Sequence, residues 1–268
     1  MTTPLSAPEA AAYLSRIGAA APQAPTAAAL ASLHRAHLLA VPFENLDISL
    51  GRPIRLDRDA LLRKVVDARR GGYCYELNGL FALLLRSLGY AVDLVSARVA
   101  SAGGGLTEDF DHLALVVTGG VLDGAVLADV GFGDAFIEPL ALRDGEQRAE
   151  PGKHVGLVRN GALWHYRERQ PDGEWHTQYV FTQASHPLAD FEERNAWQQT
   201  SPESHFTRSR VVSRLTATGR ITLSGDRLIT TTHGRRHETE LPDEDAVRAA
   251  LAEHFGIDLD GDLGMALR

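Results

Sequence analysis

The only cysteine in the chain, Cys74, lies in RRGGYCYELNGLF (residues 69–81), between a pair of glycines and an apolar run. If a helix begins after the glycines, Cys74 occupies its first turn, where unpaired backbone N–H groups and the positive end of the helix dipole favour a thiolate. Gly71 and Gly72 carry no side chain, so the backbone can turn sharply and another molecule can approach the sulfur. A tight turn beside a small buried thiol explains the same residues equally well. The stretch is therefore open to two interpretations, a nucleophile or a packed residue.

A nucleophilic cysteine requires a base, and the base requires a carboxylate that fixes its tautomer. Of the eleven histidines, His112 stands out because it opens the apolar stretch HLALVVT, and Asp129 lies inside the next strand-like stretch, VLADVGF. A buried carboxylate needs partners, because burying an unpaired charge is costly. We therefore take Cys74, His112 and Asp129 as a candidate catalytic triad.

The turn between these two stretches decides whether His112 and Asp129 can meet. If residues 119–124 form a six-residue hairpin loop, Asp129 lies diagonal to His112 on the same face of the sheet, within reach of a long side chain. If the Asp-Gly pair at 123–124 forms a two-residue turn, Asp129 lies opposite Thr118, too far from His112. Asp-Gly is a strong signal for that tight turn. The local turn chemistry thus opposes the triad that the residue types suggest.

The elements that would position these residues change type near residue 89. Helical spacing predicts helices capped by Ser6, Thr26 and Asp57, and a fourth over about 74–88. Beyond residue 90 the apolar period is typical of strands, which we expect at 90–99, 112–118, 125–132, 162–169 and 175–184, and at four places within 211–241. Between the strand at 175–184 and those within 211–241 we expect a short helix or linker at 184–197. A capped helix over 243–255 is the last expected element. We expect an α+β protein of three domains: a helical bundle over 1–89 that carries the nucleophile, an antiparallel β-barrel over 90–195 that carries the base and the carboxylate, and an α/β lid over 196–268.

Composition restricts the possible partners. The chain has 268 residues and a formal charge of -8, which disfavours a nucleic-acid or anionic-membrane binder, because such proteins gather Lys and Arg. One cysteine cannot form an internal disulfide, and neither HExxH nor a Cys/His array suggests a metal. No basic, apolar leader and no run of about 18 apolar residues is present. We expect a cytoplasmic protein, a monomer or a homodimer, with no metal, nucleic acid or membrane partner.

Five motifs, in this order along the chain, resemble those of the arylamine N-acetyltransferase family: VPFENLDI (41–48), RGGYCYELN (70–78), DHLALVV (111–117), DVGFG (129–133) and SPESHFT (201–207). Tyr75 and Leu77 stand where Phe and Gln are common in that family, and we expect Leu77 to alter the pocket wall. The resemblance implies the three-domain architecture, a cysteine-protease-like triad carried by Cys74, His112 and Asp129, and the longer hairpin loop. It further implies ping-pong acetyl transfer from acetyl-CoA to an aromatic amine, hydrazine or N-hydroxyarylamine through acetyl-Cys74.

CoA carries phosphates, so an acidic protein must hold it with local donors. The loop GFGDAF (131–136) offers backbone N–H groups of the kind that bind anions, although two glycines after a strand usually mean only a turn. The basic run THGRR (232–236) is by itself most often a solvated face, but the resemblance places CoA near this C-terminal region. We assign Gly131, Gly133 and His233 to CoA.

The acceptor pocket follows from the same resemblance. Phe132 and Phe206 are implied to line it, whereas ordinary core packing is the better interpretation of Phe43. The remaining histidines are expected to be surface or structural residues, among them His34, His37, His154, His165, His176 and His205.

Three other functions remain compatible with the sequence. Some relatives of this family close macrocyclic amides from a carrier-bound acyl chain, and the triad cannot distinguish them from acetyltransferases. A cysteine hydrolase would use the same triad with water in place of the amine. A catalytically idle binding protein has no chemical reason to keep all three groups.

Overall fold

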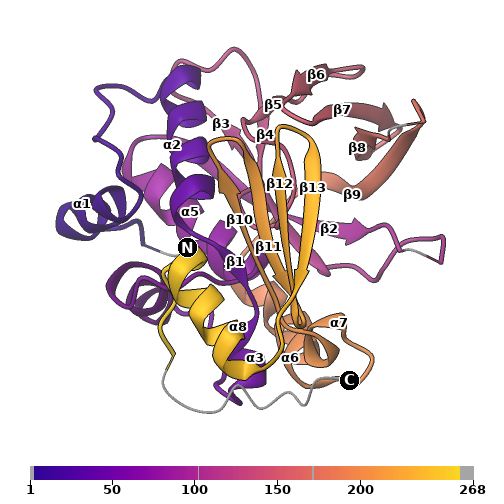
Figure 1. Cartoon of the computed structure of the whole chain (residues 1–268). Helices are drawn as coiled ribbons and strands as arrows, with labels where there is room; N and C mark the ends of the chain where they lie inside the picture. Colours follow the sequence, from indigo (N-terminus) through magenta and orange to yellow (C-terminus); the bar gives the residue numbers. More distant parts are fainter. Residues whose placement is uncertain (1–2, 102, 171, 260–268) are drawn as a thin grey trace.

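The computed structural model describes residues 3–101, 103–170 and 172–259. Its N-terminal part is helical (Figure 1). The central helix α5 is buried from Cys74 to Leu85. The caps predicted at Thr26 and Asp57 are confirmed, since each side chain accepts a hydrogen bond from the backbone N–H three residues on. The helices of this part are α1 (Ala7–Arg16), α2 (Ala27–Ala40), α3 (Leu46–Ser49), α4 (Arg58–Leu62), a π-helical turn (Arg63–Asp67) and α5 (Cys74–Ser87).

An eight-stranded antiparallel sheet follows, in the order β5-β4-β3-β2-β9-β8-β7-β6. It curves as a half-barrel whose edge strands are β5 and β6, and α5 packs against β2 and β3. Its strands are β2 (Ala91–Val99), β3 (His112–Thr118), β4 (Val126–Ala128), β5 (Leu140–Ala141), β6 (Gln147–Glu150), β7 (Lys153–Asn160), β8 (Leu163–Arg169) and β9 (Trp175–His186). The α+β class is confirmed, and α5 lies where it can present its first turn to the strands that carry His112.

The hairpin between β3 and β4 has the longer of the two loops considered from the sequence. Leu115 pairs with Ala128 and Val117 with Val126, which leaves residues 119–124 as the loop. The tight two-residue turn at Asp123-Gly124, which the local turn signal favours, is therefore not formed. The loop instead docks on the α1–α2 connector, where Val121 N–H donates to the Pro25 carbonyl at 3.2 Å. Tertiary contact with that connector thus overrides the local turn signal.

The C-terminal part is a second antiparallel sheet, in the order β1-β10-β11-β12-β13. Its edge strand β1 (Phe43–Glu44) comes from the N-terminal part, so the motif VPFENLDI joins the two ends of the chain. The other elements are a 3-10 turn (Leu188–Phe191), α6 (Glu192–Thr200), α7 (His205–Arg208), β10 (Val211–Thr216), β11 (Gly219–Ser224), β12 (Arg227–Thr232), β13 (Arg235–Glu240), α8 (Glu244–Ala250) and a π-helical turn (Leu251–Phe255). The predicted C-terminal helix is confirmed, and it packs its apolar side on this sheet.

Two features differ from the sequence predictions. β4 ends at Ala128, so Asp129 lies just beyond the strand rather than inside it. Strands β5, β6 and β7 were not predicted. Gly156 interrupts the apolar pattern of β7, because a Cβ there would lie 2.7 Å from the Glu146 carbonyl oxygen. In the described ranges, every helix is too short or too polar to cross a bilayer.

Candidate active site

The nucleophile candidate, Cys74, opens α5 and is 5% exposed. The preceding glycines let two segments of the chain lie together. A Cβ on Gly71 would lie 1.9 Å from the Pro42 carbonyl oxygen, and Gly72 bridges to Phe43 as a parallel partner. The close approach expected at the glycines is therefore made by the chain's own β1 segment, which fixes where α5 begins.

Asp129 is a buried carboxylate with four hydrogen-bond donors. His112 Nε2 donates to Oδ2 at 2.7 Å, and the Tyr179 hydroxyl donates to the same oxygen at 3.0 Å. The Asn78 amide and the Gly131 backbone N–H donate to Oδ1 at 2.8 and 2.9 Å. Every lone pair of the carboxylate therefore points at a donor, which is how a buried charge is stabilised.

The electrostatics of the pair favour a charged imidazole. Burial disfavours charge on both groups, but the His112 ring and the hydrogen bonds outweigh it and hold the pKa of Asp129 below its ordinary value. Burial likewise opposes protonation of His112, yet the Asp129 carboxylate and a hydrogen bond with Cys74 raise the pKa of His112 to about 10. The ring that contacts the Cys74 thiol is therefore protonated at neutral pH, the state that pairs with a thiolate.

A buried histidine on α2 fixes the backbone of the carboxylate. His34 Nδ1 donates to the Ile137 carbonyl at 2.9 Å, and Nε2 accepts the Asp129 backbone N–H at 3.1 Å. Burial lowers the pKa of His34 to about 4, so the ring stays neutral and keeps one donor and one acceptor. His34 is structural, in line with the prediction, and it anchors the segment after β4.

Sequence reasoning missed Asn78 and Tyr179. Asn78 also accepts the Val130 backbone N–H at 2.9 Å, so it joins α5 to the segment that carries the carboxylate. A signal for it was present, because Asn78 follows Cys74 by four residues on the same helix face and closes the motif RGGYCYELN. Tyr179 lies on β9, and no local pattern links it to Asp129.

Cys74 and His112 line a cavity of about 500 Å³. Its aromatic wall contains Phe43, Phe132, Trp197 and Phe206. The Phe132 ring meets the His112 ring edge-on at a centroid distance of 5.1 Å. Phe132 and Phe206, predicted to line the acceptor pocket, thus both face the cavity that contains Cys74, and their role in acceptor binding stays a prediction. Phe43, expected to be a core residue, both packs on the helical core and faces the cavity. Leu77, expected in the pocket wall, is instead buried in the helical core.

The residues assigned to CoA have different surroundings, and the assignment stays a prediction. Gly131 gives its N–H to Asp129, and a Cβ there would lie 2.7 Å from Cys74 Cα, so this glycine permits close packing against α5. The Gly133 carbonyl accepts a hydrogen bond from Arg220. His233 lies in the exposed turn between β12 and β13. Of these three, only Gly131 lines the cavity within the described residues.

The described parts of the chain contain no cluster of three or more His, Cys, Asp or Glu residues placed to hold a metal ion. The chemical groups that the site does bring together are a thiol, an imidazole and a carboxylate. Together these groups can form and resolve a thioester, because the imidazole can give a proton to a leaving group and take one from an incoming nucleophile.

Comparisons with known proteins show which family the chain resembles. A family model described as N-acetyltransferase matches residues 26–263. The arylamine N-acetyltransferase of Mycolicibacterium smegmatis is 36% identical over 94% of this chain and 92% of its own length. Proansamycin X synthase of Amycolatopsis mediterranei is 30% identical over 90% of this chain and 94% of its own.

A solved structure shares the fold. The Mycobacterium marinum arylamine N-acetyltransferase in complex with CoA superposes with a TM-score of 0.86 at 33% identity, over 92% of each chain. The match covers the helical part, the half-barrel and the C-terminal sheet alike. The chain belongs to the arylamine N-acetyltransferase family.

Proposed function

We propose that this protein transfers an acetyl group from acetyl-CoA to an aromatic amine, hydrazine or N-hydroxyarylamine by a ping-pong mechanism through acetyl-Cys74. The observation that carries the proposal is the 2.7 Å contact between His112 Nε2 and Asp129, on the ring that also hydrogen-bonds to Cys74. This geometry lies beside an aromatic-walled cavity of about 500 Å³. Family membership supports the same activity.

In the first half-reaction the Cys74 thiolate attacks the thioester carbonyl of acetyl-CoA. The bond between that carbon and the CoA sulfur breaks, the departing thiolate takes the proton of His112, and CoA leaves as a thiol. One thioester replaces another, so the step is close to neutral in free energy. Backbone N–H groups near Cys74 are the natural donors to the oxyanion.

In the second half-reaction the amine attacks acetyl-Cys74. His112, now neutral, takes the amine proton as the new C–N bond forms, and the Cys74 thiolate departs. The protonated ring is restored beside Asp129. In this proposal the Phe132 and Phe206 rings stack against the aromatic acceptor and orient its amine toward the thioester.

CoA must reach Cys74 through the same cavity. The M. marinum relative binds CoA, which supports CoA as the group that this chain takes up. Gly131, Gly133 and His233 remain our predicted contacts, and Gly131 contributes by close packing rather than by its N–H. The cofactor itself supplies the activated acyl group; the chain supplies the nucleophile and the proton relay.

The amide synthase alternative keeps the same triad with a carrier-bound acyl donor. Its support is the 30% identity to Proansamycin X synthase, which is lower than the identity to the M. smegmatis acetyltransferase. The hydrolase and the idle binding protein have no comparable relative among the matches described above.

The intact mass of the protein after mixing with acetyl-CoA tests the proposal. We expect a gain of one acetyl unit, absent in Cys74→Ala, that disappears when an arylamine is added and acetylated amine forms. CoA release without an adduct would indicate a hydrolase. If neither an adduct nor CoA release is observed, another acyl donor or an idle fold is favoured. Either that result or CoA release without an adduct would overturn the proposal.

A further inference from the structure

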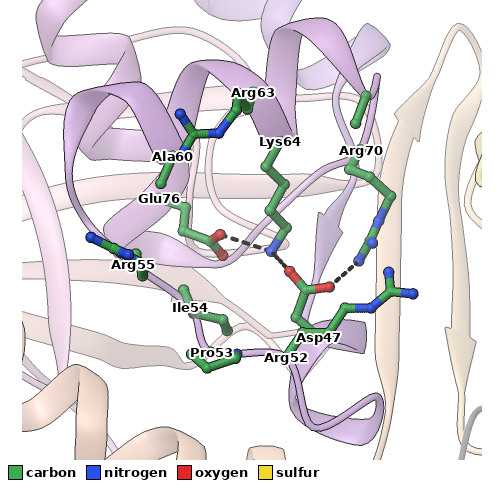
Figure 2. Close-up of a pocket in the computed structure, with 11 residues that line it drawn as sticks. Asp47, Arg52, Pro53, Ile54, Arg55, Ala60, Arg63, Lys64, Arg70 and Glu76 are labelled. Carbon is green, nitrogen blue, oxygen red and sulfur yellow. Dashed lines mark hydrogen bonds and ion pairs between the residues drawn. The ribbon is translucent and has the colours of Figure 1, made fainter.

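The first turn of α5 faces two cavities. Cys74 opens into the catalytic cavity, whereas Glu76 lines a second cavity of about 520 Å³ (Figure 2). Residues two apart on a helix point in different directions, so one turn can serve both. As far as the chain is described, no residue lines both cavities. A group that acts on Glu76 can therefore act on the nucleophile's turn without touching a substrate.

Glu76 holds the backbone on which Cys74 begins. Its Oε2 accepts the backbone N–H of Tyr73 at 3.1 Å, the residue directly before the nucleophile. A Cβ on Gly72 would lie 2.7 Å from the same oxygen, so the carboxylate is packed against the glycine loop. Glu76 itself is 1% exposed. Its position fixes the start of α5 relative to that loop.

Lys64 holds Glu76 in turn. Its Nζ lies 2.7 Å from Glu76 Oε1 and 2.8 Å from Asp47 Oδ2, and Asp47 Oδ1 lies 3.1 Å from Arg70 Nη2 (Figure 2). Arg70 is the residue that opens the glycine loop. Lys64 therefore joins three points around the nucleophile: the first turn of α5, helix α3 and the loop that precedes α5.

The charges in this group depend on Lys64. Burial disfavours its ammonium, but the surrounding carboxylates outweigh burial and raise the pKa of Lys64 above its ordinary value. Burial raises the pKa of Glu76 to about 7, Lys64 opposes that rise, and the Glu44 carboxylate adds to it. Without Lys64, a buried carboxylate would have no cation to compensate it, and such groups become neutral or are displaced.

We propose that Lys64 is a positioning residue for Cys74: by pairing with Glu76 it holds the first turn of α5, and with it the thiol, in the geometry that is acylated. Lys64 touches neither substrate nor reacting atoms and acts through Glu76. The inference deepens the proposed function and rests on it for the acetylation step, but its effect on the reactivity of Cys74 can be measured separately.

The single cysteine makes that measurement direct, because iodoacetamide can alkylate no other thiol in the chain. We would compare wild type, Lys64→Met and Lys64→Arg for alkylation of Cys74 and for its acetylation by acetyl-CoA, both by intact mass. Lys64→Met should lower both second-order rate constants by about 10- to 100-fold, the effect of a small misplacement of a reacting group. Lys64→Arg keeps the charge and the reach, and should recover most of both rates.

Two further variants separate positioning from a general loss of structure. Glu76→Gln added to Lys64→Met removes the uncompensated carboxylate but keeps an acceptor for the Tyr73 N–H, so the double variant should react faster than Lys64→Met. Arg55→Gln, at the rim of the same cavity with a side chain 73% exposed, is the matched control and should match wild type. Circular dichroism confirms that each variant is folded.

Three results would overturn the inference: a folded Lys64→Met that reacts at the wild-type rate, a Lys64→Arg as slow as Lys64→Met, or a double variant no faster than Lys64→Met. If Lys64→Met does not fold, the rates of Cys74 alkylation and acetylation in Lys64→Arg, Glu76→Gln and wild type test the inference instead. Equal rates in all three proteins would contradict positioning of Cys74 through the Lys64–Glu76 pair. Wild-type protein that is alkylated but never acetylated would refute the proposed function and leave the alkylation comparison intact.

Discussion

Two buried carboxylates act on the nucleophile through different partners, Asp129 through His112 and Glu76 through the Tyr73 N–H, and their surroundings differ. Asp129 is 0% exposed and accepts four hydrogen bonds, one of them from a protonated imidazole. Glu76 is 1% exposed and has one backbone N–H, one lysine and, nearby, the like charge of Glu44. Burial raises the pKa of both, but the donors around Asp129 reverse the effect, whereas Lys64 only limits it at Glu76.

Equal burial therefore gives different titration behaviour, because the number of donors decides whether a buried carboxylate stays fully ionised. Asp129 is ionised throughout the neutral range and can hold His112 protonated. Glu76 changes charge near pH 7. The carboxylate beside His112 thus keeps one charge state in the neutral range, whereas the carboxylate beneath the nucleophile's turn does not.

The largest effect is expected when the fully satisfied carboxylate is neutralised. Asp129→Asn should lower the rate of Cys74 acetylation by about ten-thousand-fold, because an amide presents a donor where the Nε2–H of His112 needs an acceptor and the ring adopts the wrong tautomer. Single-turnover acetylation followed by intact mass measures this rate. A loss of less than about tenfold in a folded variant would contradict the role of Asp129.

The next largest effect is expected at Asn78, which donates a hydrogen bond to Asp129 and accepts one from the Val130 N–H. Asn78→Ala leaves the Val130 N–H and one Asp129 lone pair without a buried partner. We expect the free energy of unfolding to fall by about 2–3 kcal/mol, together with a slower acetylation of Cys74. Urea denaturation measures the first quantity. An unchanged unfolding midpoint would mean that water replaces the amide.

Much of the triad could be predicted because its three residues lie in stretches with strong local patterns. The apolar spacing after Cys74 predicts α5, and the motifs resolve the hairpin loop that Asp-Gly would have misassigned. The correct loop depends on Val121 meeting Pro25, nearly a hundred residues earlier in the chain, and no local signal carries that information. Here the family resemblance supplied what turn propensity could not.

The partners of Asp129 were harder to predict, because they depend on which elements become neighbours. Tyr179 reaches the carboxylate only because β9 pairs with β2, and His34 only because α2 packs on the segment after β4. Glu76 lies in the motif RGGYCYELN and Lys64 lies outside the five motifs, and nothing in their spacing indicates that both line a second cavity, distinct from the one that contains Cys74. Such relations come from packing and not from periodicity.

A smaller effect should follow from removing one of the four donors. Tyr179→Phe deletes the 3.0 Å hydrogen bond to Asp129 Oδ2 and keeps the ring that packs on His112. We expect acetylation to slow by about tenfold, since one hydrogen bond to a charged group contributes on the order of 1.5–3 kcal/mol. The Tyr179 hydroxyl competes with His112 for Asp129 Oδ2, so without it the carboxylate stabilises the imidazolium more strongly. The pKa of His112 should therefore rise, and the alkaline limb of the pH–rate profile should move to higher pH. An unmoved limb would assign Tyr179 to packing alone.

The smallest effect on rate, but the sharpest test of the contrast between the two carboxylates, is expected from Glu76→Gln. The folded protein binds a proton at Glu76 more tightly than the unfolded chain does, because its pKa is raised from 4.5 to about 7. Stability from this group is therefore present below pH 4.5 and is lost as pH rises through 7. The free energy of unfolding of wild type minus that of Glu76→Gln should therefore be about 3 kcal/mol larger at pH 5 than at pH 8. Urea denaturation of both proteins at the two pH values measures this difference. Parallel curves for the two proteins would mean that Glu76 is ionised at both pH values, as Asp129 is, and that the two carboxylates do not differ in the way their surroundings require.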